Sequence, residues 1–122
     1  MTTIIIRKTV KKEYVGLICM GHSGYAENKP DIVCAAVSVL VINTINAIEK
    51  LAGQMPDVLQ NEETGFIRCD FKDSLNEKSI LLMDAMVLGL QDISKTYGKK
   101  YLQVKFEEVL DHVKYEPSIL RS

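Results

Sequence analysis

The stretch Pro30–Leu51, PDIVCAAVSVLVINTINAIEKL, decides the fold of this 122-residue chain. It begins with a proline, which fits the first turn of a helix, and Gly53 and Pro56 follow it as a cap and a stop. Between Ile32 and Ile48 it carries no charged residue, so the predicted helix is apolar on nearly every face. One small sheet and one neighbouring helix cannot cover all these faces, and we therefore expect a homodimer.

The same stretch has to be compared with a membrane span. A span needs about 20 consecutive apolar residues, and this run is shorter and is interrupted by Ser38, Asn43, Thr44 and Asn46. We therefore expect a buried helix in a soluble protein that does not contact a membrane.

The charges and cysteines restrict the partners and the compartment. The net charge is −1, and both signs are scattered along the chain. This pattern does not predict a nucleic-acid-binding face or a polybasic membrane patch, so we expect no direct nucleic-acid partner. The three cysteines are an odd number without paired spacing, and no signal peptide is evident, which indicates a cytoplasmic protein without disulfides.

Runs of β-branched and aromatic residues before and after the apolar helix predict strands. Ile4–Val10 and Tyr14–Met20 form one hairpin, and Val58–Gln60 and Phe66–Lys72 form another, whose alternation directs Cys69 toward the core. Together with the apolar helix, these runs account for the first five predicted elements of the chain.

Ser74 and Glu77 have the spacing of a capping box, which predicts a second helix that Gly98 ends. Tyr101–Glu107 alternates as a final strand. The order ββαββαβ predicts an α+β two-layer sandwich, a mixed five-stranded sheet with two helices on one face. We expect residues 1–122 to form a single domain, with the tail after about residue 108 partly disordered.

A histidine and a cysteine stand at the two ends of one loop. Gly21 ends the second strand, so His22 occupies a strand terminus, and Cys34 lies in the first turn of the helix that Pro30 opens. A thiol is a good nucleophile as the thiolate, which a nearby base and the amino end of a helix both favour. Burial in the apolar run Ala35–Leu40 is the structural alternative for Cys34.

Two residues near Cys34 in the sequence each have two possible roles. Asp31 could cap the helix or orient His22, and we favour the cap. Ser38 follows Cys34 by one turn on the same face, where it could donate to the thiolate or bond to its own helix. Cys19 and His22 have C-x-x-H spacing, but Cys19 belongs to an apolar strand, so we expect no metal site.

The pattern of these residues resembles the ribosomal-processing cysteine protease family, Prp. The resemblance lies in Gly21-His22-Ser23, then Asp31-Ile32-Val33-Cys34-Ala35, and Ser38 one turn later, with weaker similarity as far as Val104. The chain departs from the family pattern at Lys29, where a glycine is common.

The resemblance implies a cysteine endopeptidase that removes the short N-terminal extension of a large-subunit ribosomal protein precursor without a metal or organic cofactor. Cys34 would attack the scissile carbonyl, His22 would transfer the proton, and N–H groups at the start of the helix, including that of Cys34, would form the oxyanion hole. The loop 23–29 would act as a lid, and the peptide would meet Ser23, Gly24 and Tyr25.

Two other functions are compatible with the residues. The protein could be a non-catalytic dimeric ribosome-assembly factor that binds a ribosomal-protein tail. It could also be a small zinc-binding protein that uses the cysteines and His22.

Overall fold

The computed structural model describes residues 1–21 and 28–110, with the side chains of 28–31 left out. Seven elements follow one another along these residues: β1 (Thr2–Thr9), β2 (Tyr14–Met20), α1 (Asn28–Lys50), β3 (Asp57–Asn61), β4 (Phe66–Asp70), α2 (Glu77–Tyr97) and β5 (Leu102–Val109). This order confirms the predicted ββαββαβ arrangement. The expectation for the tail falls mainly on residues 111–122, which lie outside the described residues.

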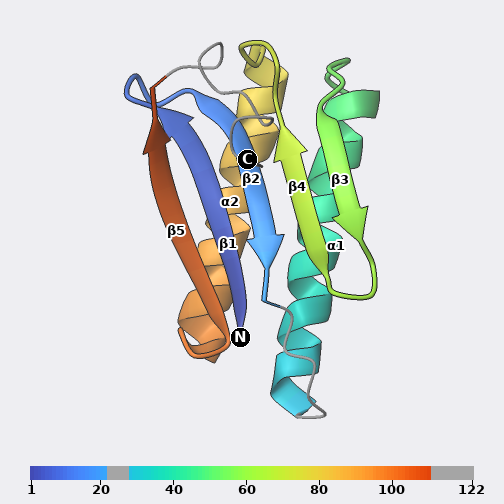
Figure 1. The fold of residues 1–122 in the computed structure, drawn as a ribbon, viewed down its shortest axis with the longest axis vertical. Helices are drawn as coiled ribbons and strands as arrows, with labels where there is room; N and C mark the ends of the chain where they lie inside the picture. The colour runs from blue at the N-terminus through green and yellow to red at the C-terminus, as the bar shows by residue number, and fades with distance from the viewer. Residues whose placement is uncertain (22–27, 111–122) are drawn as a thin grey trace, which may run out of the picture.

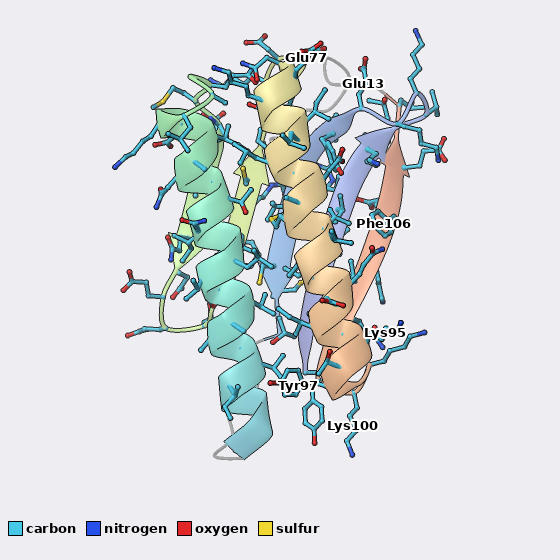
Figure 2. All side chains as sticks on the ribbon, turned by 180° about the vertical axis from the view of Figure 1, so that it is seen from behind. Glu13, Glu77, Lys95, Tyr97, Lys100 and Phe106 are labelled. Atoms are coloured by element: carbon cyan, nitrogen blue, oxygen red, sulfur yellow. The ribbon has the colours of Figure 1, made fainter. Side chains whose placement is uncertain are left out.

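The five strands form one mixed sheet in the order β3-β4-β2-β1-β5. β1 and β5 are parallel, and the other neighbouring pairs are antiparallel. Both helices cover the same face, behind the sheet in Figure 1 and in front of it in Figure 2. The fold is therefore the predicted α+β two-layer sandwich.

The core lies between the sheet and the two helices. Period-two alternation directs Ile4 and Ile6 of β1, Leu17 and Cys19 of β2, and Cys69 of β4 toward the helices, all at most 2% exposed. They meet the buried faces of α1 and α2, formed by Val33, Val37, Val41, Ile48, Met83, Met86 and Leu90. The prediction of a core position for Cys69 is confirmed. The predicted buried helix over Ile32–Ile48 is buried on one face only, because the sheet and α2 leave Ile32 and Val39 exposed.

The opposite face of the sheet carries an ion-pair row that depends on a glycine. Arg7 is only 2% exposed, and it donates from Nε to Glu107 at 3.0 Å and from Nη1 to Asp70 at 3.4 Å. Gly16 lies between Arg7 and Asp70 in the strand register. A Cβ on Gly16 would approach the Cys69 carbonyl oxygen to 2.4 Å, so the close approach of β2 and β4 requires glycine here.

The predicted capping box of α2 is wrong. Asn76, not Ser74, is the N-cap, and its side-chain oxygen accepts from the Ser79 N–H at 2.9 Å. Asn76 is held by bonds from elsewhere in the chain: its N–H donates to Gln54, and its side-chain amide donates to the Ala52 carbonyl. These tertiary hydrogen bonds select Asn76 over the serine two residues before it.

Candidate active site

Cys34 is the seventh residue of α1, because the helix begins at Asn28 and not at Pro30. The prediction that Cys34 lies in the first helical turn is therefore wrong. Its own N–H falls inside the intrahelical ladder, whereas the N–H groups without intrahelical acceptors belong to the first turn. The helix dipole acts on Cys34 from one turn away, where its effect is already weaker.

The three cysteines, all within the described residues, differ sharply in exposure. Cys19 and Cys69 are at most 2% exposed, and Cys34 is half-buried. Burial raises the pKa of the Cys69 thiol to about 12, with smaller contributions from Asp70, Asp57 and Glu49. Cys34 is therefore the thiol that a reagent or substrate can reach.

Cys19 links the end of β2 to Cys34. Burial raises the pKa of the Cys19 thiol to about 12, and electrostatic repulsion from Cys34 adds to the rise. The two sulfur groups therefore lie close enough to influence each other, one on the helix-facing side of β2 and one on α1. His22 follows Cys19 by three residues in the sequence, outside the described residues.

Gly21 has the backbone geometry that the predicted site needs at the end of β2. Its φ of 81° lies in the left-handed region, and a Cβ would stand 2.6 Å from the Met1 carbonyl oxygen. Only glycine fits this position without strain. It fixes the direction in which the chain leaves β2 toward His22.

The structure leaves several predicted site residues undescribed. His22, Ser23, Gly24 and Tyr25 lie outside the described residues, as does the predicted lid, except for the backbone of residues 28 and 29, which begins α1. Asp31 is the fourth residue of α1, so the prediction that it caps the helix is wrong, because the helix begins before it. Its side chain lies outside the description, so its role in orienting His22 is not tested. Ser38 is half-buried one turn after Cys34, which is the predicted position.

Metal binding finds no support in the described part of the chain, 1–21 and 28–110. No group of three His, Cys, Asp or Glu side chains there is arranged to hold a metal ion. Cys69, one of the four zinc ligands considered from the sequence, points into the apolar core between the sheet and the helices.

An exposed apolar surface lies beside Cys34, as expected for a helix that is apolar on more faces than the sheet and α2 can cover. Ile32 and Val39 of α1 are 55% and 67% exposed, and Ala35 between them is also exposed. Their spacing of three and four residues, which is the signal in the sequence, places them on one helical face. This face points away from the core and was expected to be covered.

Comparison with known proteins gives one consistent family. The family model described as "Cysteine protease Prp" matches residues 1–103. The ribosomal processing cysteine protease Prp of Bacillus subtilis (strain 168) is 32% identical over 101 residues, which cover 80% of this chain and 90% of that protein.

Solved structures agree with this result. The ribosomal processing protease Prp from S. aureus in complex with a substrate peptide has a TM-score of 0.81 and 25% identity, covering 88% of this chain and all of that one. The same protease with a covalently linked product peptide has a TM-score of 0.78 and 26% identity, covering 88% of this chain and 100% of that chain.

Proposed function

The chain belongs to the cysteine protease family Prp, and we propose that it is an endopeptidase that removes the short N-terminal extension of a large-subunit ribosomal protein precursor. The observation that carries this proposal is the position of Cys34. It is the only one of the three cysteines that is not fully buried, and it lies on α1 of a fold shared with S. aureus Prp in complex with a substrate peptide.

Cys34 and His22 act as a catalytic dyad in this proposal. His22 accepts the proton of the Cys34 thiol, and the thiolate sulfur attacks the scissile carbonyl carbon. The tetrahedral intermediate collapses to a thioester as His22 returns the proton to the departing amine. Water, deprotonated by His22, then hydrolyses the thioester and restores the thiol. The covalently linked product peptide of S. aureus Prp supports a covalent route.

The amino end of α1 supplies the oxyanion donors. Helical side chains lean toward the N-terminus, so the Cys34 thiol extends toward the first turn of α1. The N–H groups of that turn lack intrahelical acceptors and favour negative charge. We assign the oxyanion hole to these groups rather than to the N–H of Cys34. One such donor contributes on the order of 3 kcal/mol to transition-state stabilisation.

The remaining predicted residues support the dyad. Asp31, inside the amino end of α1, orients His22, and Ser38 donates to the thiolate or bonds within the helix. The loop from Ser23 to the start of α1 closes over the bound peptide, which contacts Ser23, Gly24 and Tyr25. This chemistry requires no metal and no organic cofactor, and it takes place in the cytoplasm, where ribosomal proteins are made.

We infer that the protein acts as a homodimer through the outer surface of its helix layer. Ile32 and Val39 of α1, together with Leu81 and Leu88 of α2, are 55–70% exposed there. Each pair is seven residues apart and so lies on one face of its helix. Leu40 fits closely over Gly89, so the two helices present one continuous surface, which faces the viewer in Figure 2. A second copy of the chain would cover this apolar surface.

Cleavage of a peptide that spans the junction of the precursor tests the function. Mass spectrometry should detect two products with the wild-type protein and intact peptide with Cys34→Ala, whose circular dichroism should be unchanged because alanine fits the helix. Cys69→Ala is the matched control, since it removes a buried thiol and should keep activity. An inactive, well-folded Cys69→Ala protein with normal cleavage by Cys34→Ala would refute the assignment of the nucleophile.

Two results would favour the other functions. A wild-type protein that binds the peptide without cleaving it would indicate a non-catalytic assembly factor. One equivalent of zinc in the purified protein, lost together with the fold on chelation, would indicate a zinc-binding protein.

A further inference from the structure

Two segments of the chain are basic and free of acidic residues: residues 1–12, with Arg7, Lys8, Lys11 and Lys12, and residues 93–106. Residues 93–106 hold four of the fifteen lysines and arginines and none of the sixteen acidic residues. The net charge of −1, from which we expected no nucleic-acid partner, averages over these two segments and the more acidic remainder. The distribution of charge within the fold is therefore more informative than the total.

The fold gathers lysines of the second segment around a groove. Lys95, Lys99 and Lys105 line a depression of about 530 Å³ between the carboxyl-terminal half of α2 and the edge strand β5. Gln91, Ser94 and Gln103 supply further polar groups, and no acidic residue is among the groove's described lining. Three ammonium groups and two amides around one open depression form a surface suited to a polyanion.

Two local contacts fix the shape of the groove. Gly98 has a φ of 106°, which turns the chain from α2 back toward β5. Ser94 donates from its hydroxyl to the Leu102 carbonyl at 2.8 Å and so ties the last turn of α2 to the start of β5. Lys95 and Lys105 therefore project from two elements that are held in place, and Lys99 from the short turn that joins them.

Aromatic side chains lie beside the lysines. Phe106 is 51% exposed and follows Val104, a lining residue, on the same face of β5. Tyr97 is 40% exposed and lies two residues from both Lys95 and Lys99. Figure 2 shows Lys95, Tyr97 and Lys100 at the carboxyl end of α2 and Phe106 further along β5.

The favourable interaction of lysines with the dipole of α2 explains only part of this grouping of lysines and aromatic residues. Lysines near the carboxyl end of a helix stabilise it, which accounts for Lys95 and Lys99. It does not account for Lys105, which projects from β5, or for the half-exposed Phe106, which follows it on the other face of the strand. A positively charged groove with exposed aromatic rings is the combination that single-stranded nucleic acids use, because phosphates pair with lysines and bases stack on rings.

We propose that this groove binds single-stranded RNA through its phosphate backbone, with a base stacked on Phe106. The lysines alone would also suit an acidic peptide, but every nucleotide of a nucleic acid supplies both a phosphate for a lysine and a flat base for Phe106, so the combination favours a nucleic acid. The groove lies at the same end of the molecule as the amino end of α1, but on the β5 side of the helix layer (Figure 2). Cys34 is not among the residues that line the groove.

Fluorescence anisotropy with a fluorescein-labelled single-stranded RNA of about 12 nucleotides tests the proposal. The wild-type protein should bind with a dissociation constant in the range of about 1–100 μM, and affinity should fall steeply between about 50 and 200 mM salt. The triple variant Lys95→Gln, Lys99→Gln, Lys105→Gln should bind at least about tenfold more weakly. Its slope of log affinity against log salt should be smaller by about 2, since each single-strand phosphate contact contributes roughly 0.7.

The matched control is the triple variant Lys11→Gln, Lys12→Gln, Lys78→Gln. It removes the same charge from exposed positions in the β1–β2 turn and the amino end of α2, at the opposite end of the molecule. Its RNA affinity should stay within about twofold of wild type. Phe106→Ala should lose about fivefold or more, the effect of one stacked base.

Three outcomes would overturn the proposal. These are wild-type protein that does not bind RNA at low salt, equal losses in the two triple variants, and competition by polyglutamate as strong as by unlabelled RNA. Equal losses of RNA affinity in the two triple variants would mean that binding depends only on the total charge of the protein. Strong competition by polyglutamate would indicate an acidic protein partner. Peptide cleavage by the groove variant should remain at the wild-type rate, so this test is independent of the proposed protease activity.

Discussion

Iodoacetamide should modify the folded protein at Cys34 and leave Cys19 and Cys69 intact. Both buried thiols have pKa values near 12, so at pH 8 only about one molecule in 10⁴ carries either thiolate. An ordinary exposed thiol with a pKa of about 8.5 is ionised in about a quarter of molecules at that pH. Ionisation alone therefore slows alkylation of Cys19 and Cys69 by more than about a thousandfold, and their burial slows it further.

Intact-protein mass spectrometry measures this directly. Native wild-type protein should gain one adduct, and peptide mapping should locate it at Cys34. The Cys34→Ala variant should gain none on the same timescale. In denaturant the two proteins should gain three adducts and two, which controls for reagent quality.

Modification of Cys19 or Cys69 in the native protein, at a rate within about tenfold of Cys34, would refute this reasoning. It would mean that the core between the sheet and α1 opens far more often than its packing indicates. A His22→Ala variant that reacts as fast as wild type from pH 6 to 9 would separate the histidine from the thiol and remove the dyad.

Three further predictions concern stability. Folding raises the pKa of the Cys19 and Cys69 thiols, so between about pH 9 and 12 the folded state keeps thiol protons that the unfolded state releases. The free energy of unfolding should therefore fall by about 1 kcal/mol per thiol for each pH unit in this range. Urea titrations that show no such decline would contradict this. Ser79→Ala should stabilise the protein by about 1 kcal/mol in thermal unfolding, because the buried Ser79 hydroxyl has no hydrogen-bond partner among the described residues. A lower melting temperature of the variant would instead show that the hydroxyl makes a stabilising hydrogen bond. Arg7→Met should destabilise by about 2 kcal/mol, since it leaves Asp70 and Glu107 close together without the buried cation, and an unchanged denaturation midpoint would show that the ion-pair row contributes little.

The element order could be predicted because each segment has a clear period. Alternation in β4 places Cys69 inside, and the uncharged run of α1 requires a long buried helix, so local patterns alone predict two layers. The cap of α2 could not be predicted, because Ser74 fits the local pattern and Asn76 is selected by Gln54 and Ala52 from the turn after α1. Local signals do not report such distant hydrogen bonds.

The candidate site was predictable in type but not in geometry. The partly exposed position of Cys34 at the amino end of α1 follows from the pattern that Pro30 opens, yet the helix begins at Asn28 and moves Cys34 into the second turn. A proline restricts the residue before it without forbidding a helical start there, so it marks a helix boundary only approximately. An uncovered apolar face on this helix was predicted, but not that Val39 belongs to it, because an apolar residue on a long helix carries no local sign of what will cover it.

The parallel pairing of β1 with β5 sets the order of folding during synthesis. Thr2 pairs with Leu102 and Thr9 with Val109, so the first strand made is flanked by the last. Until β5 leaves the ribosome, β1 is an open edge with unpaired backbone groups, which invites pairing with other chains. Contacts this distant in sequence also form slowly. The complete sheet therefore forms only after residue 109 has been translated, and interrupted synthesis before residue 102 should yield an aggregation-prone fragment rather than a smaller stable domain.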